Sequence, residues 1–185
     1  MKVACRIPGK ETRLMGIARQ EIVTKSNPLV GGFIQSLILP AIKDEEGKYS
    51  LAPKQAAKAL KHIEEGCLLW LSPTGSTEDN GLRLEDLRLG AVTFAQRAEA
   101  PIIPMGLITD EAGRITKIVF GDAIKLLPTA GVNPFELEEY LYVSSVLVLA
   151  SIAVLLPADQ RGTDLKQAEQ IIQQKENELS RYSLI

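Results

Sequence analysis

One long uncharged segment constrains the fold of this chain more than any other feature of its sequence. The nineteen residues from Tyr140 to Ala158, YLYVSSVLVLASIAVLLPA, carry no charge, and about 20 such residues span a bilayer as a helix. Three serines interrupt the segment, and Glu136, Glu138 and Glu139 stand just before it. These features favour a helix that is buried in a protein core or lies at a membrane surface over one that crosses the membrane.

Composition and charge exclude several classes of protein. The 185 residues include 21 Lys and Arg and 23 Asp and Glu, for a net charge of -2, and we predict one domain over residues 1–185. A run of five or more basic residues is missing, which argues against nucleic-acid binding. The only two cysteines, Cys5 and Cys67, form neither a disulfide framework nor a metal-binding spacing, so we expect no metal site and a cytoplasmic location. The first 13 residues lack the apolar stretch of a signal peptide.

Short apolar runs alternate with segments of helical period along the chain. This alternation is typical of an α/β domain, and we predict a mixed, largely parallel sheet flanked by helices, with further helices at the C-terminal end. The predicted strands cover residues 14–18, 38–42, 67–71, 101–108 and 115–121, of which the last two form a hairpin. The predicted helices begin at Asn27-Pro28, cover residues 50–65 and 84–99, begin again at Asn133-Pro134, and end with a polar helix over residues 163–185.

The loop that follows the predicted strand at 67–71 is the most informative stretch for binding. It reads Ser72-Pro73-Thr74-Gly75-Ser76-Thr77, and ligands favour the ends of buried strands. Hydroxyls and backbone amides in a glycine-containing turn hold phosphate, although the Gly-Lys-Ser/Thr of a P-loop does not follow. A tight turn whose hydroxyls bond their own backbone explains the same residues. The residues alone leave both interpretations open.

No catalytic residue is identifiable in this sequence. His62 is the only histidine, and any histidine general base must therefore be this residue. Helical periodicity places it with Lys54, Lys58 and Lys61 on a polar face, which is typical of a solvated side chain. Cys67 begins a buried strand without a neighbouring base, so we expect an inert thiol.

Taken together, the segments resemble the glycerol-3-phosphate and lysophosphatidate acyltransferase family. The family's apolar strand and FPEGTRS motif match LLWLSPTGSTEDNG, and its Phe-basic-basic-Gly helix and PIVPV strand match LEDLRLGAVTFAQRAEAPIIPMGL. Upstream, the family's second block is similar to ARQEIVTKSNPLVGGFIQSLILPAIKDEEG. Downstream, its FGEPI and LLPxxxRG segments match VFGDAI and LLPADQRG. The resemblance covers about residues 14–162, and it rests on five loose blocks that occur in the right order.

This resemblance implies a transfer of a fatty acyl group in phospholipid biosynthesis. The donor would be acyl-CoA or acyl carrier protein, the acceptor would be a hydroxyl of glycerol phosphate or of a lysophospholipid, and no bound cofactor is implied. A protein of this kind would be peripheral to a membrane, with the apolar helix that follows Tyr140 helping to hold it there. The substrate-binding positions implied by the resemblance are Ser72, Pro73, Thr74, Gly75, Ser76, Thr77, Arg88, Pro101 and Pro104.

The chain departs from the family in two blocks. The family's first block is a histidine and an aspartate separated by four residues, and its histidine takes the proton of the attacking hydroxyl. Residues 1–185 contain no such block, since Cys67 stands five positions after His62. In the third block Thr74 replaces a glutamate, Ser76 a threonine and Thr77 an arginine. A missing N-terminal segment explains only the first departure. The open alternatives are a fragment, a divergent enzyme with another base, a catalytically inactive lipid-binding or partner-binding relative, and a phosphate-binding α/β module outside the family.

Overall fold

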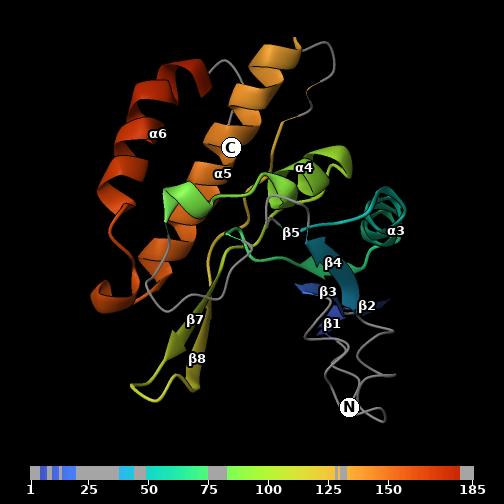
Figure 1. Cartoon of the computed structure of the whole chain (residues 1–185), viewed down its shortest axis with the longest axis horizontal. Helices are drawn as coiled ribbons and strands as arrows, with labels where there is room; N and C mark the ends of the chain where they lie inside the picture. Colours follow the sequence, from blue (N-terminus) through green and yellow to red (C-terminus); the bar gives the residue numbers. More distant parts are fainter. Residues whose placement is uncertain are drawn as a thin grey trace. The chain divides into compact units, whose positions relative to one another are not determined.

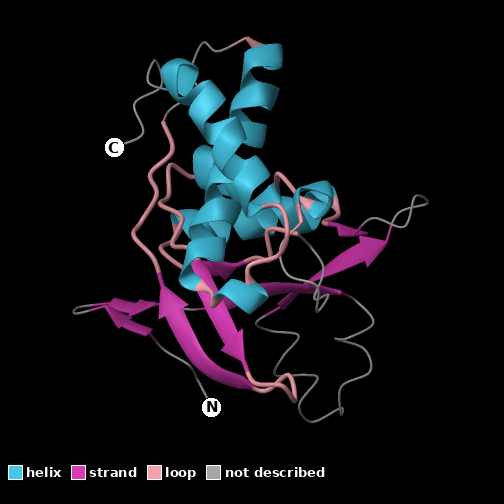
Figure 2. Ribbon diagram, turned by 90° about the vertical axis from the view of Figure 1, so that its left-hand side faces the viewer, coloured by secondary structure: helices cyan, strands magenta, loops and turns pink. Residues whose placement is uncertain are grey.

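The computed structural model of the chain describes residues 5–7, 10–12, 14–19, 38–43, 49–74, 83–127, 129 and 133–179. The chain divides into two compact units, Met1–Leu71 and Ser72–Ile185. Helices and strands both occur among the described residues (Figures 1 and 2), so the predicted mixed α/β class is confirmed. One acyltransferase-like domain over residues 1–185 stays a prediction.

The N-terminal unit is built on a four-stranded sheet in the order β5-β4-β3-β6. Strand β3 (Leu14–Arg19) pairs in parallel with β4 (Ile38–Lys43) and with β6 (Leu68–Trp70), and β5 (Tyr49–Ser50) pairs antiparallel with β4. Strands β1 (Cys5–Ile7) and β2 (Lys10–Thr12) form a separate antiparallel pair. The strands predicted at 14–18 and 38–42 are confirmed. The helix predicted from Asn27-Pro28 lies outside the described residues.

Helix α3 (Pro53–Glu64) contacts β4 and β6 in the same unit. A proline at the first helical position starts it, and Gly66, with a φ of 84°, follows its end, as expected for a residue that tolerates left-handed backbone. Its inner face centres on Ala59, which is fully buried. The helix predicted over 50–65 is thus confirmed with slightly shorter bounds.

Strand β6 is shorter and more exposed than the sequence indicated. We predicted a buried strand over 67–71, whereas the structure has a strand over Leu68–Trp70 in which Trp70 is 50% exposed. The reason is its position, because β6 lies at the end of the strand order and pairs only with β3 among the described residues. The apolar run therefore predicts the strand correctly, but it does not predict that the side chains of the strand are fully buried.

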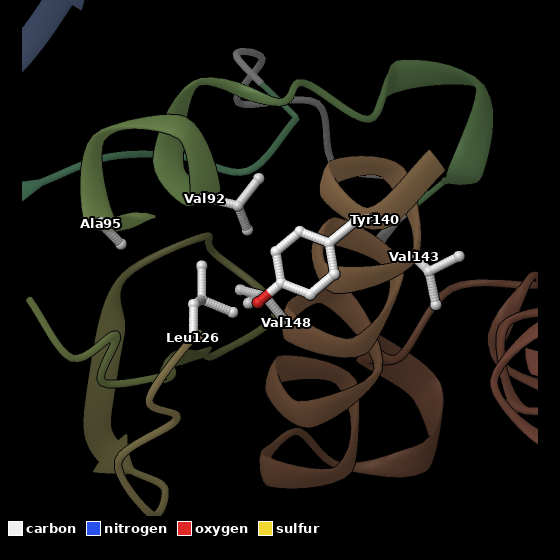
Figure 3. Packing of buried hydrophobic residues seen from close by; sticks show 6 residues of the cluster. All are labelled: Val92, Ala95, Leu126, Tyr140, Val143 and Val148. Carbon is white, nitrogen blue, oxygen red and sulfur yellow. The ribbon is translucent and has the colours of Figure 1, made fainter. Parts of the chain in front are cut away.

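The C-terminal unit is organised around helix α5 (Pro134–Leu155), which contacts α4 (Gly90–Arg97), α6 (Leu165–Leu179) and a hairpin strand. The Asn133 side chain accepts a hydrogen bond from the Phe135 amide at 3.0 Å and caps the helix, so the predicted Asn-Pro start is confirmed. Figure 3 shows the main buried cluster of this unit, in which residues from α4 and α5 meet Leu126. Its members are Val92, Ala95, Leu126, Tyr140, Val143 and Val148.

The hairpin predicted between residues 101 and 121 is confirmed, but its first strand, predicted over 101–108, begins only at Met105, and Ile102 forms an isolated bridge with Ile124. Strands β7 (Met105–Thr109) and β8 (Ile115–Phe120) pair antiparallel. The hairpin packs against the end of α5 at Gly106, where an added Cβ would lie only 3.1–3.2 Å from the side chains of Leu155 and Leu156. At the end of β7, the side-chain amide of Gln160 accepts from the Thr109 N–H at 3.2 Å and donates to the Thr109 carbonyl at 2.9 Å.

The helix predicted over residues 84–99 is partly wrong. The structure has a 3-10 turn, η1 (Leu84–Asp86), then non-helical residues, and then α4 from Gly90. Two amides explain the difference, because the Leu84 N–H donates to Asp164 Oδ2 at 2.9 Å and the Arg88 N–H donates to the Pro73 carbonyl at 2.8 Å. The Arg88 N–H therefore bonds a distant residue instead of the carbonyl of Leu84, which would be its partner in a continuous helix.

Asp164 stands just before α6 and links it to η1, and this link makes stability depend on pH. Its carboxylate accepts hydrogen bonds from the Leu84 amide and from the Thr163 hydroxyl, and these bonds lower its pKa from the ordinary value of 3.8. The stabilisation is therefore complete above the unfolded pKa and is lost as pH falls through the folded pKa.

We expect Asp164→Asn to reduce the loss of stability that the protein shows as the pH falls below about 4. Denaturant unfolding of both proteins at neutral pH and at several acidic values measures this difference. Asp159→Asn is the matched control, since Asp159 is exposed in the adjacent turn η2 (Ala158–Gln160), and it should keep the parent pH dependence. Identical acid profiles for Asp164→Asn and the parent would contradict the assignment.

Candidate functional site

The start of the predicted substrate loop forms a turn in which two hydroxyls meet. Ser72 Oγ lies 3.2 Å from Thr74 Oγ1. Thr74 is only 7% exposed, whereas Ser72 is exposed. Thr74 therefore takes part in the packing of the turn, while Ser72 faces solvent. Gly75, Ser76 and Thr77 lie outside the described residues.

A backbone hydrogen bond joins this turn to the second predicted substrate segment. The Arg88 amide donates to the Pro73 carbonyl at 2.8 Å, so residues 15 positions apart in the sequence become neighbours. Arg88 is half-buried, and no ion pair joins its guanidinium to the described residues. Hydroxyl groups and a guanidinium are groups that suit an anion such as phosphate, and this bond joins the backbones of the two segments that carry them.

The two predicted prolines lie on the ribbon that continues the β7–β8 hairpin. Pro104 is fully buried, and its carbonyl accepts from the Gly121 amide at 2.9 Å. Pro101 is exposed and precedes Ile102, which bridges to Ile124 in antiparallel fashion. The backbone hydrogen bonds of Ile102 and Pro104 join them to Ile124 and Gly121 of the same ribbon. The structure therefore brings Pro73, Thr74 and Arg88 together, while the prolines shape a neighbouring part of the chain.

His62 is less exposed than the sequence indicated. Its side chain is 24% exposed, and Nδ1 is buried at 3.6 Å from Glu65 Oε2, which is too long for a hydrogen bond. The prediction of a solvated histidine is therefore wrong in part. The physical reason is its position three residues after the fully buried Ala59, which turns one edge of the imidazole ring inward. This position gives His62 no evident role as a base.

The described residues contain no metal cluster and one long apolar helix. No group of three or more His, Cys, Asp or Glu side chains among them is placed to hold a metal ion. Helix α5 is the one described helix that is long and apolar enough to cross a membrane by length and composition. Half of the most apolar part of this helix is buried inside the protein, and core helices of soluble proteins are also long and apolar enough to meet these criteria.

Sequence reasoning missed the contacts that hold the site together. The Arg88–Pro73 bond joins two backbone groups. Every residue type supplies a backbone carbonyl, and every type except proline supplies a backbone N–H, so the residue types do not mark this bond. The anchor of η1 on Asp164 joins residues 80 positions apart. Neither contact leaves a pattern in the local sequence. The one available signal was the position of Asp164 just before a helix, which is typical of a capping residue.

Comparisons of the chain with protein-family models, with curated proteins and with solved structures found no match. The resemblance to the acyltransferase family therefore rests on the motifs quoted above and on their order.

Proposed function

We propose that this protein acts as a glycerolipid acyltransferase. In this proposal it transfers a fatty acyl group from acyl-CoA or acyl carrier protein to a hydroxyl of glycerol phosphate or of a lysophospholipid, at the surface of a membrane. Five sequence blocks in the family's order support the proposal. The parallel pairing of β3 with β4 and with β6 supports the finer fold that accompanies it, a largely parallel sheet flanked by helices.

The observation that carries the proposal is the 2.8 Å hydrogen bond between the Arg88 amide and the Pro73 carbonyl. It holds the backbone of Arg88 beside the hydroxyl-bearing turn at Ser72 and Thr74. A guanidinium binds phosphate through two parallel hydrogen bonds. Arg88 would thus supply the positive charge that the third block lacks, where Thr77 replaces the family's arginine.

The chemistry of the transfer defines what the site has to do. The acceptor oxygen attacks the thioester carbonyl carbon, an ester C–O bond forms, and the C–S bond breaks. The hydroxyl proton leaves through a base and ends on the released thiol of CoA or of the carrier protein. Binding and orienting the acceptor phosphate is the part of this reaction that we assign to Arg88 and the turn.

A second candidate function is lipid binding without acyl transfer. The observation that favours it is the missing histidine–aspartate block in residues 1–185, together with the position of His62 on α3 of the N-terminal unit. An inactive relative would keep the phosphate contacts of Arg88 and would release no thiol. The two candidates therefore differ in chemistry and agree in the acceptor they bind.

Arg88→Ala should weaken the binding of glycerol 3-phosphate and lysophosphatidate about tenfold or more, because charge-assisted hydrogen bonds contribute about 1.5–3 kcal/mol. Titration calorimetry with the full chain measures this change. Arg97→Ala is the matched control, since Arg97 is exposed at the end of α4, and its affinity should equal that of the parent. Equal affinities for all three proteins would remove Arg88 from the site.

A thiol-release assay with acyl-CoA or acyl carrier protein then separates the two functions. Thiol release that requires the acceptor and falls in Arg88→Ala supports acyl transfer. Acceptor binding without thiol release from either donor supports the lipid-binding relative. A parent protein that binds neither glycerol 3-phosphate nor lysophosphatidate contradicts both candidates.

A further inference from the structure

The charges of the chain are divided unequally between its two units. Residues 1–71 contain eleven Lys and Arg against seven Asp and Glu, a net charge of +4. Residues 72–185 contain ten Lys and Arg against sixteen Asp and Glu, a net charge of -6. A negatively charged surface therefore attracts the first unit and repels the second.

Within the positive unit, three lysines form a stripe along α3. Lys54, Lys58 and Lys61 are all exposed. Their spacing of four and three residues places them on one side of the helix, opposite the fully buried Ala59. We call these three residues the lysine stripe. The helix thus has one face buried against β4 and β6 and one face with three ammonium groups in solvent.

The lysine stripe is largely available for a partner. No ion pair joins Lys54 or Lys58 to the described residues. Lys61 lies 3.8 Å from Glu65, but the two side chains are 76% and 51% exposed, and such exposed pairs are weak and screened by salt. A surface of phosphate groups competes readily with a contact of this kind.

We propose that the lysine stripe of α3 docks the protein on the anionic headgroups of a membrane. Charge complementarity carries this inference, since the stripe lies in the unit whose net charge is positive. It rests on the proposed function, because a lysophospholipid acceptor is found at a membrane surface. The apolar stems of the lysines lie along the surface while their ammonium groups reach the lipid phosphates. Each lysine near an anionic membrane raises binding about fivefold.

Vesicle co-sedimentation of the full chain tests the proposal. The probes are vesicles of phosphatidylcholine alone and vesicles of phosphatidylcholine with phosphatidylglycerol. We expect the parent protein to bind the anionic vesicles, to bind the neutral ones much more weakly, and to dissociate as salt is raised. The triple variant Lys54→Gln, Lys58→Gln, Lys61→Gln should bind anionic vesicles about a hundredfold more weakly, since three contributions are lost.

The matched control is the triple variant Lys117→Gln, Lys125→Gln, Lys166→Gln. It makes the same change in net charge at three exposed lysines of the other unit, and it should bind as the parent does. Glutamine and lysine have similar helix propensities, and circular dichroism checks that α3 remains folded. Equal vesicle binding by the two triple variants overturns the proposal, and so does equal binding of the parent to neutral and anionic vesicles.

Two further measurements separate this proposal from its alternatives. Binding of an acidic protein such as acyl carrier protein through the lysine stripe, without vesicle binding, overturns it in favour of a protein partner. Titration of the triple variant of the lysine stripe with glycerol 3-phosphate, in the absence of vesicles, measures binding at the acceptor site alone. Loss of vesicle binding with intact acceptor binding supports docking by the stripe. A parent protein that binds anionic vesicles but neither glycerol 3-phosphate nor lysophosphatidate contradicts only the proposed function.

Discussion

Replacing Tyr140 with alanine should lower the free energy of unfolding of the C-terminal unit by about 3–5 kcal/mol. Tyr140 is 3% exposed and belongs to the buried cluster in which α5 meets α4 (Figure 3). Its hydroxyl oxygen accepts a hydrogen bond from the Leu127 amide at 2.9 Å. Truncation therefore leaves a cavity at the centre of the unit and removes the partner of a backbone amide. Denaturant unfolding followed by circular dichroism measures the effect.

Two further variants separate packing from hydrogen bonding at this position. Tyr140→Phe keeps the ring and removes only the hydroxyl, so we expect a loss of about 1–2 kcal/mol. Tyr142→Ala serves as the control, because Tyr142 lies two residues along the same helix and is 41% exposed, and it should cost less than about 1 kcal/mol. A cost for Tyr142→Ala equal to that for Tyr140→Ala would contradict the assignment of Tyr140 to the core of the unit.

A charge at Ala168 should separate α6 from α5. Ala168 is 1% exposed and packs with Val146 and Ala150 in a second buried cluster. A carboxylate forced into this contact without a partner costs about 3–5 kcal/mol, so Ala168→Asp should expose the α6 backbone while α4 stays protected. Amide hydrogen exchange, measured helix by helix, follows this local opening.

The neighbouring position provides a control with the same side chain. Gln167 is exposed on the same turn of α6, so Gln167→Asp introduces an identical charge without burying it. We expect its α6 amides to exchange as slowly as those of the parent protein. Equal exchange in the two aspartate variants would mean that α6 is held by something other than the contact around Ala168.

Features of the fold that depend on neighbouring residues could be predicted from the sequence. Asn133 and Pro134 specify a helix start through contacts with their immediate neighbours in the chain. Gly66 supplies the left-handed backbone after a helix end. The helix predicted to follow Thr163 is also present as α6, and its residues Leu165 and Ile171 pack against the cluster around Ala168. In each case the signal and the structure lie within the same segment.

Features that depend on distant residues could not be predicted. The break before α4 arises because Asp164 and Pro73 bond the amides of Leu84 and Arg88, and no local propensity encodes these partners. The exposure of Trp70 follows from the edge position of β6, which depends on sheet order. At the candidate site the sequence indicated Thr74 and Arg88 as separate positions, and only the fold makes their segments neighbours.

The side chain of Gln160 has a consequence for the solubility of the hairpin. Its carboxamide offers one donor and one acceptor to Thr109, as a peptide group of an adjoining strand would. Both the N–H and the carbonyl of Thr109 thereby have a hydrogen-bond partner within the chain. A sheet edge with unpaired backbone groups recruits strands from other molecules and promotes aggregation. The Gln160 side chain thus occupies the backbone groups of Thr109 that a strand from another molecule would otherwise bind.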